Sequence, residues 1–304
     1  MPLPVVYHTN YVTPLPPEHR FPMPKFGVIY DIIRRDGFRD AVQFFEPEVP
    51  PDEWITLVHS RQYYDSLMDG TLSRKAVRKI GLPLSRELML RTRTAVGGTI
   101  LTAKLALEYG LACNTAGGTH HAFPEYGSGF CLLNDLAVTA RVIQEEGLAT
   151  NIMIIDLDVH QGDGTAAAFE NFPSIYTFSM HCEANFPFVK VRSDLDVALE
   201  KGMHNAEYLD ILNRYIPEIF EQFTPDLVLY DAGVDTHKED RLGKLNLTDS
   251  GLRRRDELVI ESCIQHQVPV ACVIGGGYDE VFTLSQRHTI LHRTASELFA
   301  KYLI

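Results

Sequence analysis

Four apolar segments that each end in a polar or glycine-rich cluster constrain the fold of this chain more than any other feature. The segments are residues 151–160, 174–181, 226–233 and 268–277. Short apolar runs of this kind are typical of strands buried inside a parallel sheet. Their polar clusters read DLDVHQGDG, SMHCE, DAGVD and GGGYDE. Because ligands of open α/β sheets bind beyond the carboxyl ends of the strands, the clusters predict one site at one sheet edge.

Helical patterns lie between these segments. Residues 86–109, 136–146 and 206–223 carry apolar side chains at helical spacing, and Gly147 marks the end of the second helix. Alternating strands and helices predict an α/β fold, with a mostly parallel central sheet and helices on both faces. The sequence shows no internal repeat or long linker, so we expect residues 1–304 to form a single domain.

The charge and the cysteine content indicate the cellular environment of the protein and the kinds of partner that it can bind. The formal net charge is -12, which disfavours general nucleic-acid binding and favours the steering of cationic ligands toward the protein. The five cysteines show no regular spacing, which indicates reduced thiols in a cytoplasmic protein. No signal peptide is evident, and no apolar run approaches the roughly 20 residues of a membrane span, so no membrane partner is expected.

Three clusters contain side chains that bind metals or move protons. The first, GGTHHAF, contains His120 and His121. The second, IIDLDVHQGDG, contains four potential ligands: Asp156, Asp158, His160 and Asp163. The third, YDAGVDTHKED, contains Asp231, Asp235, His237, Glu239 and Asp240. One histidine and two carboxylates would form a three-ligand catalytic metal site with an open position, suited to Zn²⁺ but also admitting Fe²⁺ or Co²⁺.

Simpler explanations account for parts of these clusters. Adjacent histidines are as often ordinary loop residues as catalytic ones, Asp163 could cap a following helix, and Glu239 fits a solvated acidic loop. A cap does not explain three further polar residues at the end of a buried strand, because buried carboxylates need partners and a metal supplies one. The glycine run before Tyr278 lacks the GxGxxG spacing of a dinucleotide site.

Five motifs occur in one order along the chain: GGTHHA, GSGFCLLND, DLDVHQGDG, DAGVD followed by DRLGKLNLT, and IGGGY. In this order and approximate spacing they resemble the histone deacetylase and arginase-like superfamily, and within it the class IV-like, bacterial-type lysine deacetylases. The resemblance covers nearly the whole chain. It implies the arginase/deacetylase fold and a zinc-dependent amidohydrolase that removes an acyl group, acetyl or longer, from lysine side chains.

The resemblance also implies a role for each matched position. His121 would be the general base and then the general acid, and His120 would stabilise charge. The residues that orient these two histidines would be Asp156 for His120 and Asp163 for His121. Tyr278 would donate a hydrogen bond to the oxyanion. Gly129 and Phe130 would line the substrate channel.

Two cation sites follow from the same resemblance. The zinc ligands would be Asp158, His160 and Asp235. A structural potassium ion would be held, mostly by backbone carbonyls, at Asp156, Asp158, His160, Ser179 and Met180.

Departures from the family and other interpretations of the chain remain. The segment SMHCEANFPF differs from class I members, so Cys182, Glu183 and Phe186 could shape a different acyl pocket. The loop at residues 82–86 lacks the acidic pattern with which nuclear members grip substrate. The substrate is expected to be an acylated lysine in a protein or peptide, or an acylated polyamine, as in acetylpolyamine amidohydrolases. A non-catalytic acyl-lysine-binding module is disfavoured because every matched position is filled, and a second, arginase-like ligand set is not evident.

Overall fold

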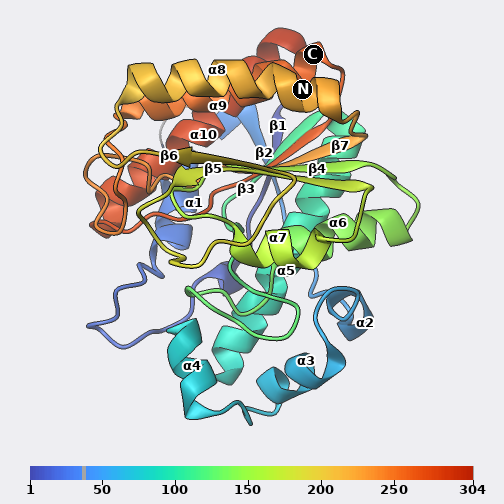
Figure 1. Ribbon diagram of the computed structural model, residues 1–304, viewed down its shortest axis with the longest axis vertical. Helices are drawn as coiled ribbons and strands as arrows, with labels where there is room; N and C mark the ends of the chain where they lie inside the picture. The colour runs from blue at the N-terminus through green and yellow to red at the C-terminus, as the bar shows by residue number, and fades with distance from the viewer. Residues whose placement is uncertain (36–38, 304) are drawn as a thin grey trace.

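The four strands expected from the sequence lie side by side in one sheet: β4 (Ile152–Asp156), β5 (Ile175–Cys182), β7 (Leu227–Asp231) and β8 (Val270–Val273). The computed structural model describes residues 1–35 and 39–303. Within that part of the chain the sheet has eight strands, all parallel, in the order β2-β1-β3-β8-β7-β4-β5-β6 (Figure 1). Sequence periodicity missed four strands of four or five residues: β1 (Leu3–Val6), β2 (Val42–Phe45), β3 (Leu111–Asn114) and β6 (Leu195–Leu199).

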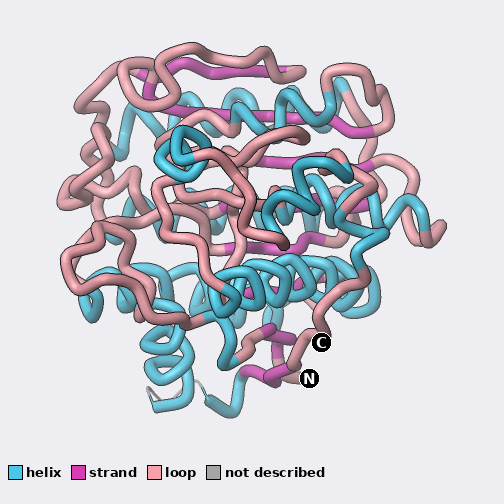
Figure 2. The backbone as a smooth tube through the Cα atoms, turned by 90° about the horizontal axis from the view of Figure 1, so that it is seen from below, coloured by secondary structure: helices cyan, strands magenta, loops and turns pink. Residues whose placement is uncertain are grey.

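Helices cover both faces of the sheet, as predicted (Figures 1 and 2). One face carries α1 (Lys25–Arg35), α8 (Asn205–Gln222), α9 (Asp249–Gln265) and α10 (Val281–Tyr302). The other carries α5 (Arg86–Tyr109), α6 (Asp135–Glu145) and α7 (Asp163–Phe169). The helices α2 (Asp52–Ile55), α3 (Arg61–Met68) and α4 (Arg74–Ile80) lie beyond α5, and two 3-10 turns span Thr9–Tyr11 and Arg39–Ala41. None of the described helices is both long enough and apolar enough to cross a lipid bilayer.

The core consists of two apolar layers, one on each face of the sheet. Side chains alternate between the faces along each strand. Met153 and Ile155 therefore join the larger cluster, whereas Ile152 and Ile154 join the cluster that packs under α5 and α6. Strand β4 is buried along its whole length. This double coverage explains why the central strands read as continuous apolar runs.

Helix α5 is well defined by its ends and by a close approach in its middle. The side chain of Ser85 accepts a hydrogen bond from the N–H of Leu88, and Gly110 ends the helix in a left-handed conformation. A Cβ at Gly97 would overlap the carbonyl oxygen of Glu48, and one at Gly98 would overlap the Tyr11 hydroxyl. The two glycines therefore allow the N-terminal segments to pack directly on the helix.

The backbone after β4 differs from an extended strand. The strand ends at Asp156, and the chain bends through residues 157–162 before α7 begins. Asp156, Asp158 and His160 would share one face only if the strand continued, and it does not. Each side chain therefore has its own direction, and the bend distributes them over two neighbouring groups.

Candidate active site

Three residues from two strand ends form a buried cluster at the carboxyl edge of the sheet. Asp158 and His160 follow β4, and Asp235 follows β7, the adjacent strand. Nδ1 of His160 lies 2.9 Å from Oδ1 of Asp158 and 3.1 Å from Oδ2 of Asp235. One ligand atom of each residue lies within 4.8 Å of the others. The predicted zinc ligands are thus brought together.

The surroundings of this cluster fit a bound divalent metal. Oδ2 of Asp235 is buried and lies 3.1 Å from Nδ1 of His160 without the alignment of a hydrogen bond, which leaves a buried carboxylate oxygen poorly satisfied. The N–H of Gly276 donates to Oδ2 of Asp158 at 2.8 Å. A Cβ at this glycine would overlap carboxylate oxygens of both aspartates. One imidazole and two carboxylates also match the donor set of a catalytic zinc site.

The two adjacent histidines lie beside the cluster, each held by its own aspartate. Nδ1 of His120 lies 2.7 Å from Oδ2 of Asp156, and Nδ1 of His121 lies 2.7 Å from Oδ1 of Asp163. The ring centroids are 4.1 Å apart. Because a carboxylate at Nδ1 fixes the tautomer of each ring, Nε2 is the atom available for proton exchange.

Burial and the surrounding charges give the two histidines different pKa values. Burial, followed by the neighbouring His120, lowers the pKa of His121 to about 4, although Asp163 acts in the opposite direction. Burial would also lower the pKa of His120, but the carboxylates of Asp156 and Asp158 outweigh burial and hold this pKa well above its usual value. At neutral pH His121 is therefore neutral and able to accept a proton, whereas His120 carries a positive charge.

A second group of potential ligands, His120, Asp156 and Asp231, lies next to the first. All three were candidates in the sequence, but their grouping was not expected. Asp231 pairs in register with Asp156, and its Oδ2 lies 3.8 Å from Nδ1 of His120. Among the described residues, neither carboxylate oxygen of Asp231 has a hydrogen-bond partner. Burial, then the neighbouring Asp156, raises the pKa of Asp231 well above its ordinary value. Since His120 is already paired with Asp156, Asp231 extends this pair toward β7.

Tyr278 approaches the metal-ligand cluster from the end of β8. Its ring centroid lies 6.3 Å from that of His160. Its backbone N–H donates to Oδ2 of Asp240 at 2.7 Å, which anchors the segment. Burial, then the nearby Asp158, raises the pKa of the Tyr278 hydroxyl well above its usual value. The hydroxyl therefore stays protonated and can donate a hydrogen bond.

The outer cavity, an open space of about 620 Å³, leads from solvent to His121, His160 and Tyr278. Gly129 and Phe130 form one wall, with left-handed φ angles of 53° and 66°. A Cβ at Gly129 would lie 2.6 Å from Cδ2 of His121, so only glycine lets this wall contact the ring.

Phe186 forms another wall of the outer cavity, with its ring centroid 4.8 Å from that of His121. Of the three residues expected to shape the acyl pocket, it alone is among the described residues that line this cavity. Cys182 is buried in the core, and Glu183 is exposed near His181. The SMHCEANFPF segment thus reaches the outer cavity through Phe186 and two further residues, Asn185 and Phe188.

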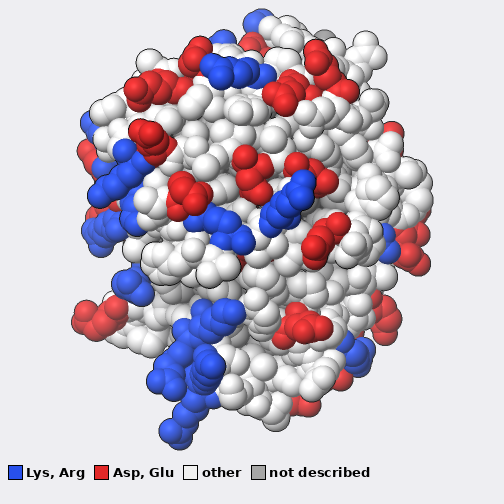
Figure 3. All heavy atoms as spheres, viewed as in Figure 1, with Lys and Arg blue, Asp and Glu red and all other residues white. Residues whose placement is uncertain are grey.

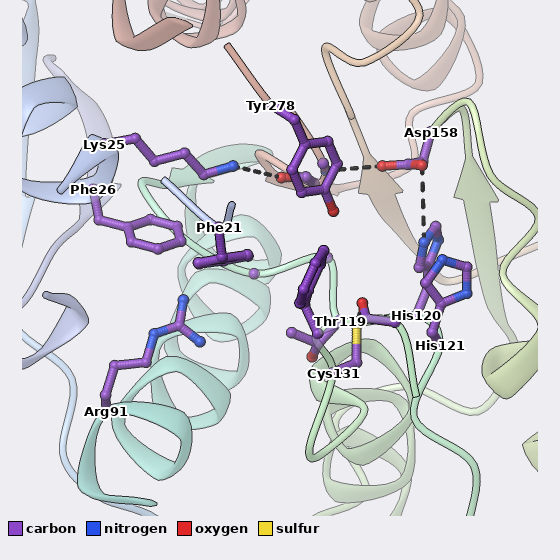
Figure 4. Close-up of a pocket in the computed structure, with 16 residues that line it drawn as sticks. Phe21, Lys25, Phe26, Arg91, Thr119, His120, His121, Cys131, Asp158 and Tyr278 are labelled. Carbon is purple, nitrogen blue, oxygen red and sulfur yellow. Dashed lines mark hydrogen bonds and ion pairs between the residues drawn. The ribbon is translucent and has the colours of Figure 1, made fainter. Parts of the chain in front are cut away.

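The inner cavity, of about 30 Å³, lies behind the histidines (Figure 4). Lys25 and Arg91 line it from the side opposite His120 and His121. Nζ of Lys25 donates to the carbonyl oxygen of Gly275 at 3.3 Å, and burial lowers the pKa of Lys25 to about 8. Neither cation forms an ion pair with a carboxylate in the described part of the chain. No local sequence signal marks this pair, since its members come from separate helices.

Arg255 stabilises the backbone that follows β7 through hydrogen bonds to its carbonyl groups. It is fully buried on α9, where Nη2 donates to the carbonyl oxygen of Ala232 at 3.1 Å and Nη1 donates to that of Gly233. Its charge is balanced by Asp256, which also accepts from the Tyr230 hydroxyl at 2.6 Å. The helical spacing of the sequence indicates that this arginine is buried, because it falls on the same face of α9 as the buried apolar residues.

His59 supports the loop that carries the tandem histidines. Its Nε2 accepts from the backbone N–H of Asn134 at 2.9 Å, so Nδ1 carries the proton and donates to the carbonyl oxygen of Phe123 at 3.1 Å. Asn134 in turn donates to the carbonyl oxygen of Ala122 at 3.2 Å and caps α6. His59 is therefore a neutral, buried positioning residue that lies outside every sequence motif described above.

The residues expected to hold potassium lie on two adjacent strands and the bend after β4. Asp156 pairs in register with Ser179, and Met180 follows on β5, fully buried. The Ser179 hydroxyl lies 3.0 Å from Nδ1 of His181. These positions are neighbours of the His120–Asp156 pair.

The chain is similar to known proteins in both sequence and structure. The histone deacetylase domain family matches residues 19–293. An uncharacterized protein of Picosynechococcus sp. is 57% identical over 300 residues, covering 98% of this chain and all of its own. Histone deacetylase 2 of Arabidopsis thaliana is 31% identical over 269 residues, with 86% of this chain and 70% of its own covered.

A more distant relative and a solved structure are also similar to this chain. The acetoin utilization protein AcuC of Staphylococcus aureus is 27% identical over 253 residues, which cover 76% of this chain and 65% of that protein. The crystal structure of the HDA15 HD domain superposes with a TM-score of 0.81 at 19% identity, covering 99% of this chain and 88% of that one. The structural likeness bears on the fold, which is that of the histone deacetylases.

Proposed function

Because the chain belongs to the histone deacetylase family and is thus a hydrolase of amide bonds, we propose that it removes short acyl groups, foremost acetyl, from lysine side chains in a metal-dependent reaction. The proposed metal is Zn²⁺, with Fe²⁺ as the alternative that the ligand types admit. The observation that carries the proposal is the buried cluster of Asp158, His160 and Asp235 beneath the paired histidines. We propose that residues 1–304 act as one catalytic domain.

Each residue around the cluster has a distinct role in the proposed amide hydrolysis. A divalent metal held by Asp158, His160 and Asp235 would polarise the acyl carbonyl and acidify a water molecule. His121, neutral at pH 7, takes the proton of the attacking water at Nε2 and then delivers it to the leaving amine. His120, held positive by its carboxylate neighbours, stabilises the negative charge that develops during attack.

Tyr278 contributes at the carbonyl oxygen. Its protonated hydroxyl donates a hydrogen bond as that oxygen becomes negative, which is typically worth about 3 kcal/mol. The walls formed by Phe130 and Phe186 hold the aliphatic stem of the lysine and exclude water from the reacting bond.

The inner cavity supports the choice of a short acyl group. Its volume of about 30 Å³ suits a group of a few heavy atoms. Lys25 and Arg91, two buried cations without a carboxylate partner among the described residues, provide a favourable environment for a carboxylate product. A long fatty chain directed inward would have to displace these two side chains.

The rim of the outer cavity disfavours an acylated polyamine as substrate. Arg20, Arg78 and Lys79 line it, and no acidic residue does among those described. A polycationic substrate would be repelled at the entrance, in spite of the overall charge of -12.

The potassium ion is a separate proposal. Its support is the proximity of Asp156 and Ser179 on paired strands. Potassium retention after exchange into a sodium-free and potassium-free buffer, measured by elemental analysis, tests it independently of zinc.

A turnover panel tests the proposed function. Purified protein loaded with Zn²⁺ is assayed on peptides carrying acetyl-lysine or longer acyl-lysines and on acetylated polyamines, with and without a chelator. We expect acetyl-lysine peptides to be hydrolysed fastest, chelation to stop hydrolysis, and Zn²⁺ to restore it. Hydrolysis that persists after complete metal removal would exclude the metal mechanism, and faster turnover of polyamines would exclude the proposed substrate.

A further inference from the structure

The α4 cluster, which we define as Arg74, Lys75, Arg78 and Lys79, is a concentrated positive patch on an acidic protein. Helix α4 reads RKAVRKI, and all four basic side chains are exposed. Figure 3 shows Lys and Arg gathered over the position that α4 occupies in Figure 1. The net charge of the whole chain is -12, so this patch runs against the overall balance.

Helix stability does not account for the cluster. Arg78 and Lys79 lie in the last turn, where the helix dipole favours cations, but Arg74 and Lys75 lie in the first turn, where it disfavours them. Residues four positions apart face each other, so Arg74 repels Arg78 and Lys75 repels Lys79. Within the described structure, none of the four forms an ion pair with a carboxylate. The like charges therefore carry an electrostatic cost that no carboxylate offsets within the described structure.

The cluster is attached directly to the channel wall. The N–H of Phe130 donates to the carbonyl oxygen of Ile80 at 2.7 Å, and that of Gly129 donates to the carbonyl oxygen of Lys79 at 3.3 Å. The end of α4 is thus held at the entrance by the same residues that line the channel. Arg78 and Lys79 line the outer cavity, and Arg20 joins them from the N-terminal segment.

The other wall of the entrance is apolar. Phe188 is 87% exposed and lines the outer cavity beside Phe186, at a ring-centroid distance of 6.4 Å. Nζ of Lys79 lies 3.6 Å from the centroid of the Tyr126 ring, which holds this side chain in place. Arg20 and Arg78 line the outer cavity as exposed cations, and Arg74 and Lys75 continue the exposed positive charge along α4.

We propose that the α4 cluster, with Arg20, binds carboxylates of a peptide substrate next to its acyl-lysine, so that the enzyme selects acidic segments. The inference rests on the proposed deacylase function and adds the sequence context of the substrate. Because attraction between exposed charges is screened beyond about 8 Å, the recognised carboxylates belong to the residues that the bound peptide places beside these cations. Phe188 offers an apolar contact to the same segment.

Three matched peptides test the proposal. Each carries one acetyl-lysine, flanked by glutamates, by glutamines or by lysines at the same positions. We expect kcat/KM to fall in the order glutamate, glutamine, lysine, by about tenfold per step, with the difference residing mainly in KM and shrinking as salt is raised. The double variant R74E/R78E should reverse the order. Arg214→Glu, an exposed arginine on α8, makes the same change of charge per residue away from α4 and should keep the order of the wild type.

The outcomes separate this inference from the proposed function. Equal kcat/KM for all three peptides, or an order unchanged in R74E/R78E, would overturn the role of the α4 cluster while leaving deacylation intact. A preference for the lysine-flanked peptide would overturn it as well. Failure to hydrolyse any of the peptides, including the glutamine-flanked one, would instead contradict the proposed function itself. Thermal unfolding of each variant establishes that charge reversal has left the fold in place.

Discussion

The backbone N–H of Gly276 donates a hydrogen bond to Oδ2 of Asp158, so the end of β8 orients a carboxylate that comes from the end of β4. The contact spans 118 positions of the chain. It requires a residue without a side chain, because a Cβ at position 276 would overlap the oxygens of Asp158 and Asp235. The geometry of the proposed metal site therefore depends on a glycine that is not itself a proposed metal ligand.

Replacing Gly276 with Ala should abolish metal retention. The new methyl group would push apart the two carboxylates, and we expect bound Zn²⁺ to fall from one per chain to nearly none, with a matching loss of turnover. Gly27→Ala is the control, because a Cβ there meets only Cγ2 of Val12 at 3.3 Å. Elemental analysis of both purified variants gives the answer, and full metal content in the Gly276 variant would contradict the ligand assignment.

Replacing Tyr278 with Phe should separate catalysis from metal binding. The ring and its packing are kept, while the hydroxyl that we propose as the oxyanion donor is lost. We expect kcat to fall by roughly 10²–10³, as for other single oxyanion donors. Metal content should stay at one ion per chain, and KM should change little. An unimpaired kcat would remove Tyr278 from the mechanism.

Arg255 should matter for stability far more than its neighbour on the same helix. Arg255→Met leaves Asp256 as an uncompensated buried charge and frees two carbonyl groups beneath the strand ends. We expect the free energy of unfolding to drop by about 3–5 kcal/mol. Arg254→Met, at an exposed position, should change it by less than about 0.5 kcal/mol. Urea unfolding of the two variants beside the wild type makes the comparison, and equal losses would refute the stabilising role of Arg255.

His59 should make the protein sensitive to acid. Burial lowers the pKa of His59 to about 4, whereas an unfolded histidine titrates near 6.5, so the unfolded state binds more protons between these values. The stability that this histidine contributes is therefore complete above about pH 6.5 and is lost as the pH falls toward 4, by about 3 kcal/mol in total.

His59→Gln provides the test of that loss. Glutamine can accept from Asn134 and donate to Phe123 without titrating. Urea unfolding from pH 7 to pH 4 should show a smaller decrease in stability for the variant than for the wild type. Parallel curves would mean that His59 does not stay neutral in the fold.

The strand ends were predictable because their signal is local. A short apolar run followed by Asp, His or Gly indicates both a buried strand and its functional edge, and this pattern marks the clusters that contain Asp158, His160 and Asp235. The family resemblance, and not the pattern, selected these three positions and Tyr278 from the other candidates. The short strands β1 and β3 carry no comparable signal, since four residues cannot establish a period. Their place in the sheet is decided by packing between distant segments.

Supporting residues were harder to foresee for a related reason. Lys25 meets Gly275 across 250 positions, and His59 meets Asn134 across 75. The sequence around these residues shows no pattern that would predict either contact. The basic entrance was also unforeseen, because net charge is a sum over the surface, whereas the entrance depends on where a few cations are placed.

The pairing of β4 with β7 has a consequence for how the protein is made. Asp158 and His160 leave the ribosome long before Asp235 and Gly276, and the two parts join only when the sheet closes between them. A nascent chain that ends before β7 holds only two of the three proposed metal ligands, so the proposed site is incomplete in it. Metal capture would therefore follow the pairing of β4 with β7, and a bound ion would mark a chain in which that pairing has formed.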